Sequence, residues 1–129
     1  MTVLVIDDHR DSREVLGLSL RQYAANIETA ESVAAAVERI RQRRPDVLVS
    51  DLAMPGEDGF SLLAKIRDLE GGSDIPIIAV TGFASTADRA KTLSAGFDAH
   101  FSKPVNVERL VATIGALVFG RQRSADAKA

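Results

Sequence analysis

The stretch VLVSDLAMPGEDG, residues 47–59, places four mostly apolar residues directly before an aspartate and a loop that contains proline and glycine. A short run that is continuously apolar, rather than alternating, is typical of a strand that helices cover on both faces of a parallel sheet. Pro55 and Gly56 favour a turn, and Asp58 is placed to cap the helix that follows. We therefore predict a buried strand that ends on the carboxylate of Asp51.

The same pattern recurs along the chain. Apolar runs at residues 3–6 and 77–80, with weaker ones at 27–30 and 99–101, alternate with segments of helical period. This alternation indicates repeated strand–helix units around a parallel sheet. We expect a single α/β domain of five strands and five helices.

The expected helices begin and end at residues that favour helix termini. Ser32 and Asn106 are placed as N-caps of the second and fifth helices. Gly96 follows the fourth helix, where glycine commonly ends a helix. The fifth helix carries the clearest apolar stripe, and we expect it to end near Phe119.

Length and composition are those of one compact domain. The chain has 129 residues, of which 46% are hydrophobic, and this is enough for a single core. We expect a domain over residues 1–119. The segment GRQRSADAKA, residues 120–129, lacks apolar periodicity, so we expect a flexible C-terminal tail there.

Charge and cysteine content exclude several classes of function. Sixteen Lys and Arg stand against 18 Asp and Glu, and the net charge of −2 gives no strong attraction to nucleic acid or to a membrane surface. The absence of cysteine excludes disulfides, thiolate metal sites and a cysteine nucleophile. No signal peptide and no apolar segment near the roughly 20 residues of a bilayer span are evident. We expect a cytoplasmic protein with no direct nucleic-acid binding and no membrane insertion.

Polar side chains stand where the predicted strands end. Asp7 and Asp8 follow the first strand, Asp51 ends the third, Thr81 ends the fourth and Lys103 follows the fifth. Each of them alone has an ordinary role as a turn former, a strand filler or a solvated charge. Ligands of open parallel sheets, however, bind outside the carboxyl ends of the strands. With a strand order of 2-1-3-4-5, all five side chains would converge on one edge.

Electrostatics limit which ligands can bind at such an edge of the sheet. Two like charges about 4 Å apart repel by ~1 kcal/mol in water and ~4 kcal/mol at an effective dielectric constant near 20. Three clustered carboxylates therefore need either a cation or raised pKa values. If a cation is bound, a set of oxygen ligands favours Mg²⁺. The first strand leads into DDHRDS, which holds no glycine, and no glycine-rich phosphate loop occurs in the chain. Nucleotide binding is excluded on that ground.

Four motifs together carry a family resemblance. They are VLVIDDHRDSRE, VLVSDLAMPGEDGF, IIAVTGFA and HFSKPV. In their order and spacing they closely resemble the CheY-like receiver domain of two-component response regulators, over residues 2 to about 119. The resemblance implies a doubly wound, flavodoxin-like (βα)5 fold with a five-stranded parallel sheet in the order 2-1-3-4-5.

The resemblance also implies a phosphoacceptor and a metal site. Asp51 would take a phosphoryl group from a phosphohistidine of a sensor histidine kinase or a histidine phosphotransfer protein. Asp8 and Asp51 would bind Mg²⁺ directly, together with the backbone carbonyl of Ala53, and Asp7 would act through water. For His9, beside the acid pair, the sequence favours a solvated loop residue over a further metal ligand.

The remaining site residues are implied in the same way. Lys103 would pair first with Asp51 and then with the phosphoryl oxygens, and Thr81 would hydrogen-bond the phosphoryl group after transfer. The Lys103–Pro104 peptide bond would be cis. His100 stands where the family usually has Tyr or Phe as a switch residue coupled to Thr81, and a role as the switch and a role as an ordinary half-exposed strand residue both stay open.

Three functional classes compete for this sequence. The first is a signalling phosphoacceptor, not an enzyme in the wider sense, whose only catalysis is its own phosphorylation and slow dephosphorylation. The second is a non-phosphorylated interaction module of the same fold. The third is a metal-dependent aspartyl phosphatase, which the adjacent Asp7 and Asp8 and the lack of room for a cap domain disfavour.

The output of the phosphoacceptor is not encoded in recognisable motifs. We expect either a stand-alone regulator or the receiver of a hybrid histidine kinase. In the resembled family the docking face is built by the fourth helix, the fifth strand and the fifth helix. The downstream effector that would bind this face is unknown.

Overall fold

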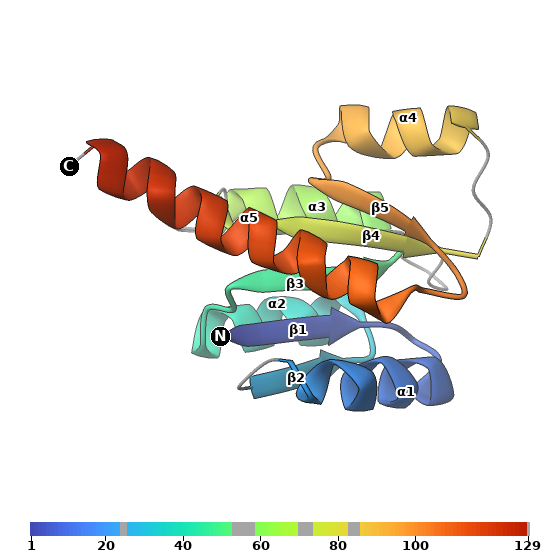
Figure 1. The fold of residues 1–129 in the computed structure, drawn as a ribbon. Coiled ribbons are helices and arrows are strands. Elements are labelled where there is room, and N and C mark those ends of the chain that lie inside the picture. Colours follow the sequence, from blue (N-terminus) through green and yellow to red (C-terminus); the bar gives the residue numbers. More distant parts are fainter. Residues whose placement is uncertain (24–25, 53–58, 70–73, 83–85, 129) are drawn as a thin grey trace.

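The computed structural model describes the backbone of residues 1–23, 26–52, 59–69, 74–82 and 86–128. Within these ranges, five parallel strands form one sheet in the order β2-β1-β3-β4-β5, which confirms the predicted fold class (Figure 1). The strands are β1 (Thr2–Ile6), β2 (Asn26–Ala30), β3 (Val47–Asp51), β4 (Ile77–Thr81) and β5 (Ala99–Ser102). The helices are α1 (Arg10–Arg21), α2 (Val33–Gln42), α3 (Gly59–Asp68), α4 (Thr86–Ala95) and α5 (Val107–Lys128).

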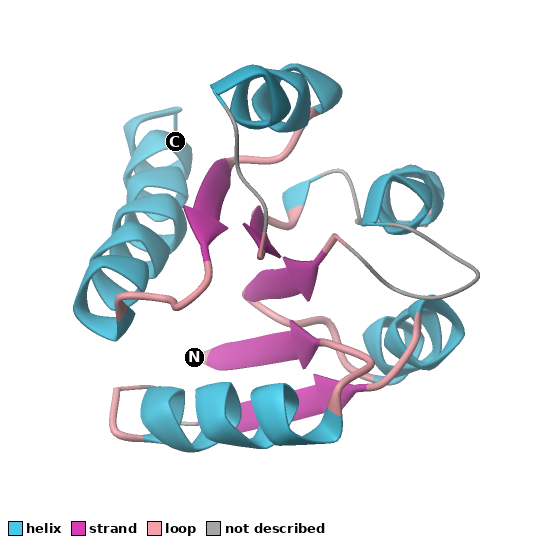
Figure 2. Cartoon of the chain, turned by 90° about the vertical axis from the view of Figure 1, so that its right-hand side faces the viewer, coloured by secondary structure: helices cyan, strands magenta, loops and turns pink. Residues whose placement is uncertain are grey.

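Helices cover both faces of the sheet, as Figure 2 shows in a view turned by 90°. α1 and α5 lie on one face, and α2 and α3 lie on the other. Because successive side chains of a strand point to opposite faces, each central strand feeds two cores. On one face Leu4 and Leu48 pack with Ile66 of α3, and on the other Val3 and Val49 pack with Ile114 of α5.

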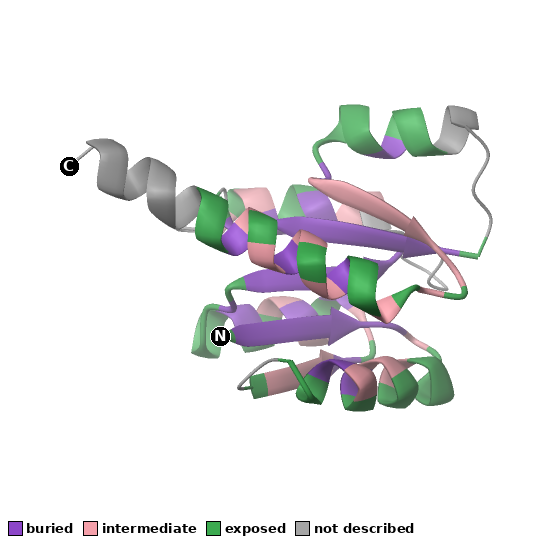
Figure 3. Ribbon diagram, viewed as in Figure 1, coloured by how far each residue is buried: buried purple, intermediate pink, exposed green. Residues whose placement is uncertain are grey.

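The burial of the strands explains their sequences. All residues of β1, β3 and β4 are buried, whereas β2 and β5 at the sheet edges are mostly of intermediate exposure (Figure 3). The three continuously apolar runs are therefore the central strands. Full burial of a Val, Leu or Ile side chain stabilises the fold by about 1.5–3 kcal/mol.

Three predicted helix termini are confirmed. The Ser32 side chain accepts a hydrogen bond of 3.1 Å from the backbone N–H of Ala35, and Asn106 Oδ1 accepts one of 3.1 Å from Arg109. Gly96 ends α4 with a φ of 118°, a left-handed conformation that glycine adopts without the strain of a Cβ. The predicted turn and cap at Pro55, Gly56 and Asp58 lie outside the described residues.

The expected end of the fifth helix was wrong. α5 does not end near Phe119 but continues to Lys128. The segment 120–129 lacks an apolar stripe, but it is rich in Arg, Gln, Ala and Lys, which have high intrinsic helix propensity. The flexibility of this segment stays a prediction. Among the described residues, no helix combines the length and the apolar character needed to cross a bilayer.

Candidate functional site

The carboxyl ends of four neighbouring strands meet at one edge of the sheet. β1 ends directly before Asp7, β3 ends on Asp51 and β4 ends on Thr81. The register pairs Asp51 with Val80 and Thr81 with Ser102, so that these strand ends lie side by side. The fold therefore gathers the strand-end side chains that the sequence analysis singled out.

Two of the carboxylates are buried at this edge. Asp7 is 5% exposed and Asp51 is 6% exposed, and the hydroxyl residue Thr81 is 8% exposed. Aspartates are almost never fully buried unless a partner compensates the charge. Two buried carboxylates side by side therefore require a nearby cation.

Lys103 supplies one such cation. Its Nζ lies 2.9 Å from Oδ2 of Asp51 and 3.4 Å from Oδ2 of Asp7. Partial burial by itself lowers the pKa of Lys103, but the hydrogen bonds and the charges of Asp51 and Asp7 outweigh it, and the net pKa is raised above its ordinary value. The ammonium is thus protonated at neutral pH and offsets part of the negative charge.

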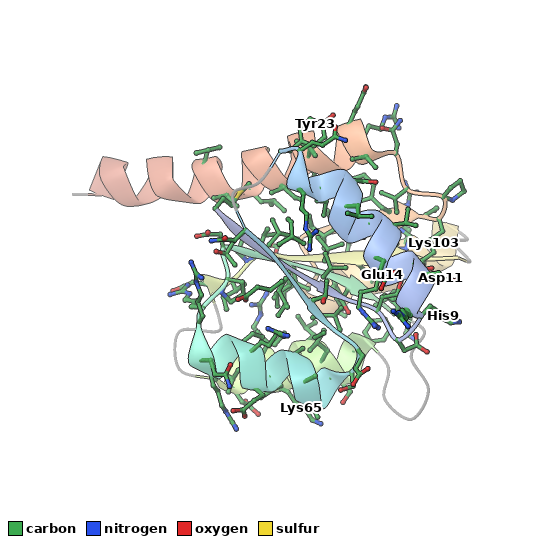
Figure 4. All side chains as sticks on the ribbon, turned by 90° about the horizontal axis from the view of Figure 1, so that it is seen from below. His9, Asp11, Glu14, Tyr23, Lys65 and Lys103 are labelled. Atoms are coloured by element: carbon green, nitrogen blue, oxygen red, sulfur yellow. The ribbon has the colours of Figure 1, made fainter. Side chains whose placement is uncertain are left out.

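Asp8 and His9 extend this group toward solvent. Asp7, Asp8, His9 and Asp51 each offer one ligand atom, and these atoms all lie within 4.8 Å of one another. Figure 4 shows His9 at the start of α1, at the same end of the molecule as Lys103. Three carboxylates exceed the single charge of Lys103, and their oxygens are the ligands that Mg²⁺ prefers. The donor set therefore fits a hard divalent cation.

Comparison with models of protein families identifies the family whose members carry such a group of strand-end residues. The model described as the response regulator receiver domain matches residues 3–115, a range that contains every strand-end residue named above. The chain belongs to the response regulator receiver domain family. It is accordingly a receiver domain of the kind found in two-component systems.

Relatives of this receiver domain include proteins of very different length. An uncharacterized 14.6 kDa protein of Leptolyngbya boryana is 37% identical over 86% of this chain and 85% of its own length. The response regulator MprA of Mycobacterium leprae is 37% identical over 92% of the chain, which spans about half (51%) of MprA. Hybrid signal transduction histidine kinase D of Dictyostelium discoideum is 36% identical over 90% of the chain but only 8% of its own length.

Solved structures agree with the receiver fold. A putative response regulator of Chloroflexus aurantiacus has a TM-score of 0.82 at 28% identity and covers 91% of this chain and 96% of its own. The receiver domain of the Francisella response regulator 1452 has a TM-score of 0.83 at 26% identity, over 93% and 98% of the two chains. The chemotaxis protein CheY4 of Vibrio cholerae has a TM-score of 0.82 at 27% identity, over 90% and 97%.

Several hydrogen bonds hold the acidic residues of the receiver domain in place. The guanidinium of Arg13 in α1 donates to the backbone carbonyl of Asp7 at 2.9 Å, and Ser50 Oγ donates to the carbonyl of Asp51 at 3.1 Å. The backbone N–H of Lys103 donates to the carbonyl of Thr81 at 2.8 Å. Sequence reasoning missed Arg13 and Ser50. Arg13 is six positions from Asp7 and Ser50 directly precedes Asp51, but neither position in the sequence indicates a side-chain contact to a backbone carbonyl.

Thr81 and His100 have one clear geometric relation. The register pairs Ala79 with His100 and Thr81 with Ser102, so Thr81 and His100 project from the same face of the sheet. His100 is half-buried. Its coupling to Thr81 stays a prediction.

Two further expectations concern residues in the loops that follow β3 and β5. The Lys103–Pro104 peptide bond is cis, in agreement with the expectation. The proposed backbone ligand at Ala53 lies outside the described residues and stays a prediction.

A cavity of about 420 Å³ opens beside the carboxylates, between α1 and the segment that leads from β5 into α5. Asp51 and Lys103 line one end of the cavity. The rest of its lining is largely apolar and comes from the sheet, from α1 and from Val105. The Asp51 side chain is therefore buried at the sheet edge and still reachable from this side.

Proposed function

We propose that Asp51 of this receiver domain is the phosphoacceptor of a two-component or phosphorelay system. The observation that supports this best is the contact between the buried Asp51 carboxylate and Lys103, 2.9 Å apart, beside the acid pair of Asp7 and Asp8. Such a group of residues combines a nucleophile with the positive charge that phosphoryl transfer needs.

In the proposed reaction an Asp51 carboxylate oxygen attacks the phosphorus of a phosphohistidine on the partner protein. The new bond is the O–P bond of an aspartyl phosphate, and the P–N bond of the donor breaks. Its electron pair stays on the imidazole nitrogen that leaves. Asp51 reacts in its ionised form, so no proton has to be removed from the nucleophile. The partner is a sensor histidine kinase or a histidine phosphotransfer protein.

Lys103 has a second task in this proposal. Before transfer its ammonium offsets the charge of Asp51 and Asp7, to which it is hydrogen-bonded. After transfer the same ammonium lies beside the phosphoryl oxygens that Asp51 carries. Charge-assisted contacts of this type are roughly twice as strong as neutral hydrogen bonds, so Lys103 favours the phosphorylated product as well as the reactant.

The carboxylates would hold Mg²⁺ during transfer. Asp8 and Asp51 are the proposed direct ligands, with the backbone carbonyl of Ala53, and Asp7 contributes through water. When bound, Mg²⁺ neutralises negative charge on the carboxylates and on the transferring phosphoryl oxygens. With the cation bound to these carboxylates, this edge of the sheet would accept a phosphoryl group instead of repelling it.

Thr81 and His100 would carry the signal away from the site. Thr81 ends β4 beside Asp51, and its hydroxyl would turn to the phosphoryl group once that group is present. Its neighbour strand β5 holds His100 on the same face of the sheet. The proposed consequence is a change in the surface of α4, β5 and α5, where the downstream effector binds.

A phosphodonor experiment tests the proposed function. The purified chain is incubated with acetyl phosphate and Mg²⁺ and its intact mass is measured, with Asp51→Asn and a chelator as controls. We expect one phosphoryl group on the wild-type chain and none in either control. No adduct with any donor would favour a binding-only module, and turnover of an external phosphoester would favour a phosphatase.

A further inference from the structure

We propose that His9 is a nitrogen ligand of the metal site, so that this receiver domain binds divalent ions that accept imidazole more tightly than its carboxylates alone would. Such ions are the later divalent metals of the first transition row, for example Co²⁺, Ni²⁺ and Zn²⁺. The proposal rests on the proposed function only in that both use the same carboxylates.

The donor atoms of His9 and Asp8 have the spacing of adjacent ligands in a coordination shell. His9 Nδ1 lies 3.2 Å from Oδ1 of Asp8 and 3.8 Å from Oδ1 of Asp7, and the ligand atoms of all four residues fall within 4.8 Å of one another. Ligands held about 2.1 Å from one ion lie ~3.0 Å apart when adjacent and ~4.2 Å apart when opposite. Without an ion, the 3.2 Å contact of His9 Nδ1 with Asp8 is a hydrogen bond, which an ion bound between the two groups would replace.

The backbone brings the imidazole to this position. His9 is the N-cap residue of α1, in an extended conformation, and its side chain makes no capping hydrogen bond to the helix. Its backbone N–H instead donates to Oδ1 of Asp7 at 2.9 Å, which ties the start of α1 to the acid pair. The His9 side chain is 72% exposed, so little packing hinders its rotation toward an ion.

The cations around His9 have other partners. Lys103 contacts the Oδ2 atoms of Asp51 and Asp7, whereas His9 lies near the Oδ1 atoms of Asp7 and Asp8. Arg10 pairs with Glu14 at 3.1 Å, and the Arg13 guanidinium donates to the Asp7 carbonyl. The imidazole and the ammonium therefore approach different oxygens and do not exclude each other.

Ligand chemistry predicts how the His9 imidazole changes the selectivity of the site for one metal over another. Mg²⁺ prefers oxygen ligands and keeps several waters, so a nearby imidazole adds little to its affinity. Co²⁺, Ni²⁺ and Zn²⁺ accept imidazole readily, and their affinity for mixed N and O sites is intrinsically higher. His9 should thus change metal selectivity more than Mg²⁺ affinity.

The test measures metal binding itself. Titration calorimetry of the full chain, with any affinity tag removed, follows Mg²⁺ and Co²⁺ in wild type, His9→Ala and Arg10→Gln, the last being the matched exposed neighbour. We expect His9→Ala to lose roughly tenfold in Co²⁺ affinity and to stay within about twofold for Mg²⁺. The Co²⁺ absorption spectrum should shift in His9→Ala only, because a nitrogen ligand is lost.

Each result has a distinct meaning. Equal Co²⁺ affinity and an unchanged spectrum in His9→Ala would overturn the inference while Mg²⁺-dependent phosphorylation of Asp51 stands. Equal losses for Co²⁺ and Mg²⁺ would also overturn it, because His9 would then act only by positioning the acid pair. No binding of either ion to folded wild-type protein would overturn both this inference and the proposed Mg²⁺ site.

Discussion

At the scale of single residues, the surroundings of Asp51 explain why a buried strand ends on a charge. The carboxylate is 6% exposed and shares the Lys103 ammonium with the equally buried Asp7. Removing the ammonium from this partly buried ion pair destabilises the fold, because the buried carboxylates lose its compensating charge. The buried Asp51 carboxylate therefore depends on a neighbour that is 52 positions away in the sequence.

Lys103→Met should destabilise the fold in a pH-dependent way. Its pKa is raised in the folded chain by Asp51 and Asp7 despite partial burial. Its stabilisation is therefore fully present below the unfolded pKa of about 10.4 and is lost as pH rises through the folded pKa. We expect a loss of about 1–2 kcal/mol at pH 7 and 9 that shrinks above about pH 10.5.

Urea unfolding of wild type and Lys103→Met at matched pH values measures this difference. Comparison of the two chains at each pH cancels the titration of the other lysines. A difference that stays constant or grows above pH 11 would contradict the assigned ion pairs.

At the scale of elements, single residues fix the helix termini. Ser32→Ala removes the oxygen that accepts the Ala35 N–H at the start of α2, and the expected cost is about 1 kcal/mol of unfolding free energy. Ser12→Ala, at an exposed position within α1, is the control and should change stability by less than about 0.5 kcal/mol. Urea unfolding of both variants checks this, and equal effects would rule out the cap as the cause.

Gly96 allows the turn from α4 into β5. Its φ of 118° is strained for any residue with a Cβ, and an added Cβ would lie 3.5 Å from Leu63 Cδ2. We expect Gly96→Ala to lower the melting temperature, at a cost of about 1–3 kcal/mol. Gly120→Ala within α5 meets no atom within 4 Å and should be neutral or stabilising. A Gly96→Ala chain as stable as wild type would show that the turn does not need glycine.

At the scale of the whole molecule, local sequence predicts the central strands but not the assembly of the site. The continuous apolar runs predicted the three central strands, because complete burial leaves no room for alternation. The gathering of Asp7, Asp51, Thr81 and Lys103 needed the strand order, which no local pattern encodes and which the family resemblance supplied.

Other features depend on three-dimensional detail that the sequence does not display. The Arg13 contact to the Asp7 carbonyl depends on the angle at which α1 leaves β1. The extension of α5 to Lys128 does not follow from apolar periodicity, because this segment owes its helix to the propensity of its residues. Both cases show that polar contacts and helix lengths are less predictable than the core.

Phosphorylation should alter the molecule through Thr81. Thr81→Val keeps the shape of the side chain but removes the hydroxyl, so Asp51 should still accept a phosphoryl group. We expect the amide NMR shifts of β5 and α5 that accompany phosphorylation of wild type to be largely lost in Thr81→Val. Shifts of equal size in both proteins would show that the signal does not pass through this hydroxyl.

The most direct test of the central claim locates the phosphoryl group. An aspartyl phosphate is an acyl phosphate, which borohydride reduces to homoserine, whereas a free aspartate is left intact. The chain is phosphorylated with acetyl phosphate and Mg²⁺, reduced and analysed by peptide mass spectrometry. We predict homoserine at position 51 alone. Homoserine at position 7 or 8 instead, or at no position, would show that Asp51 is not the phosphoacceptor.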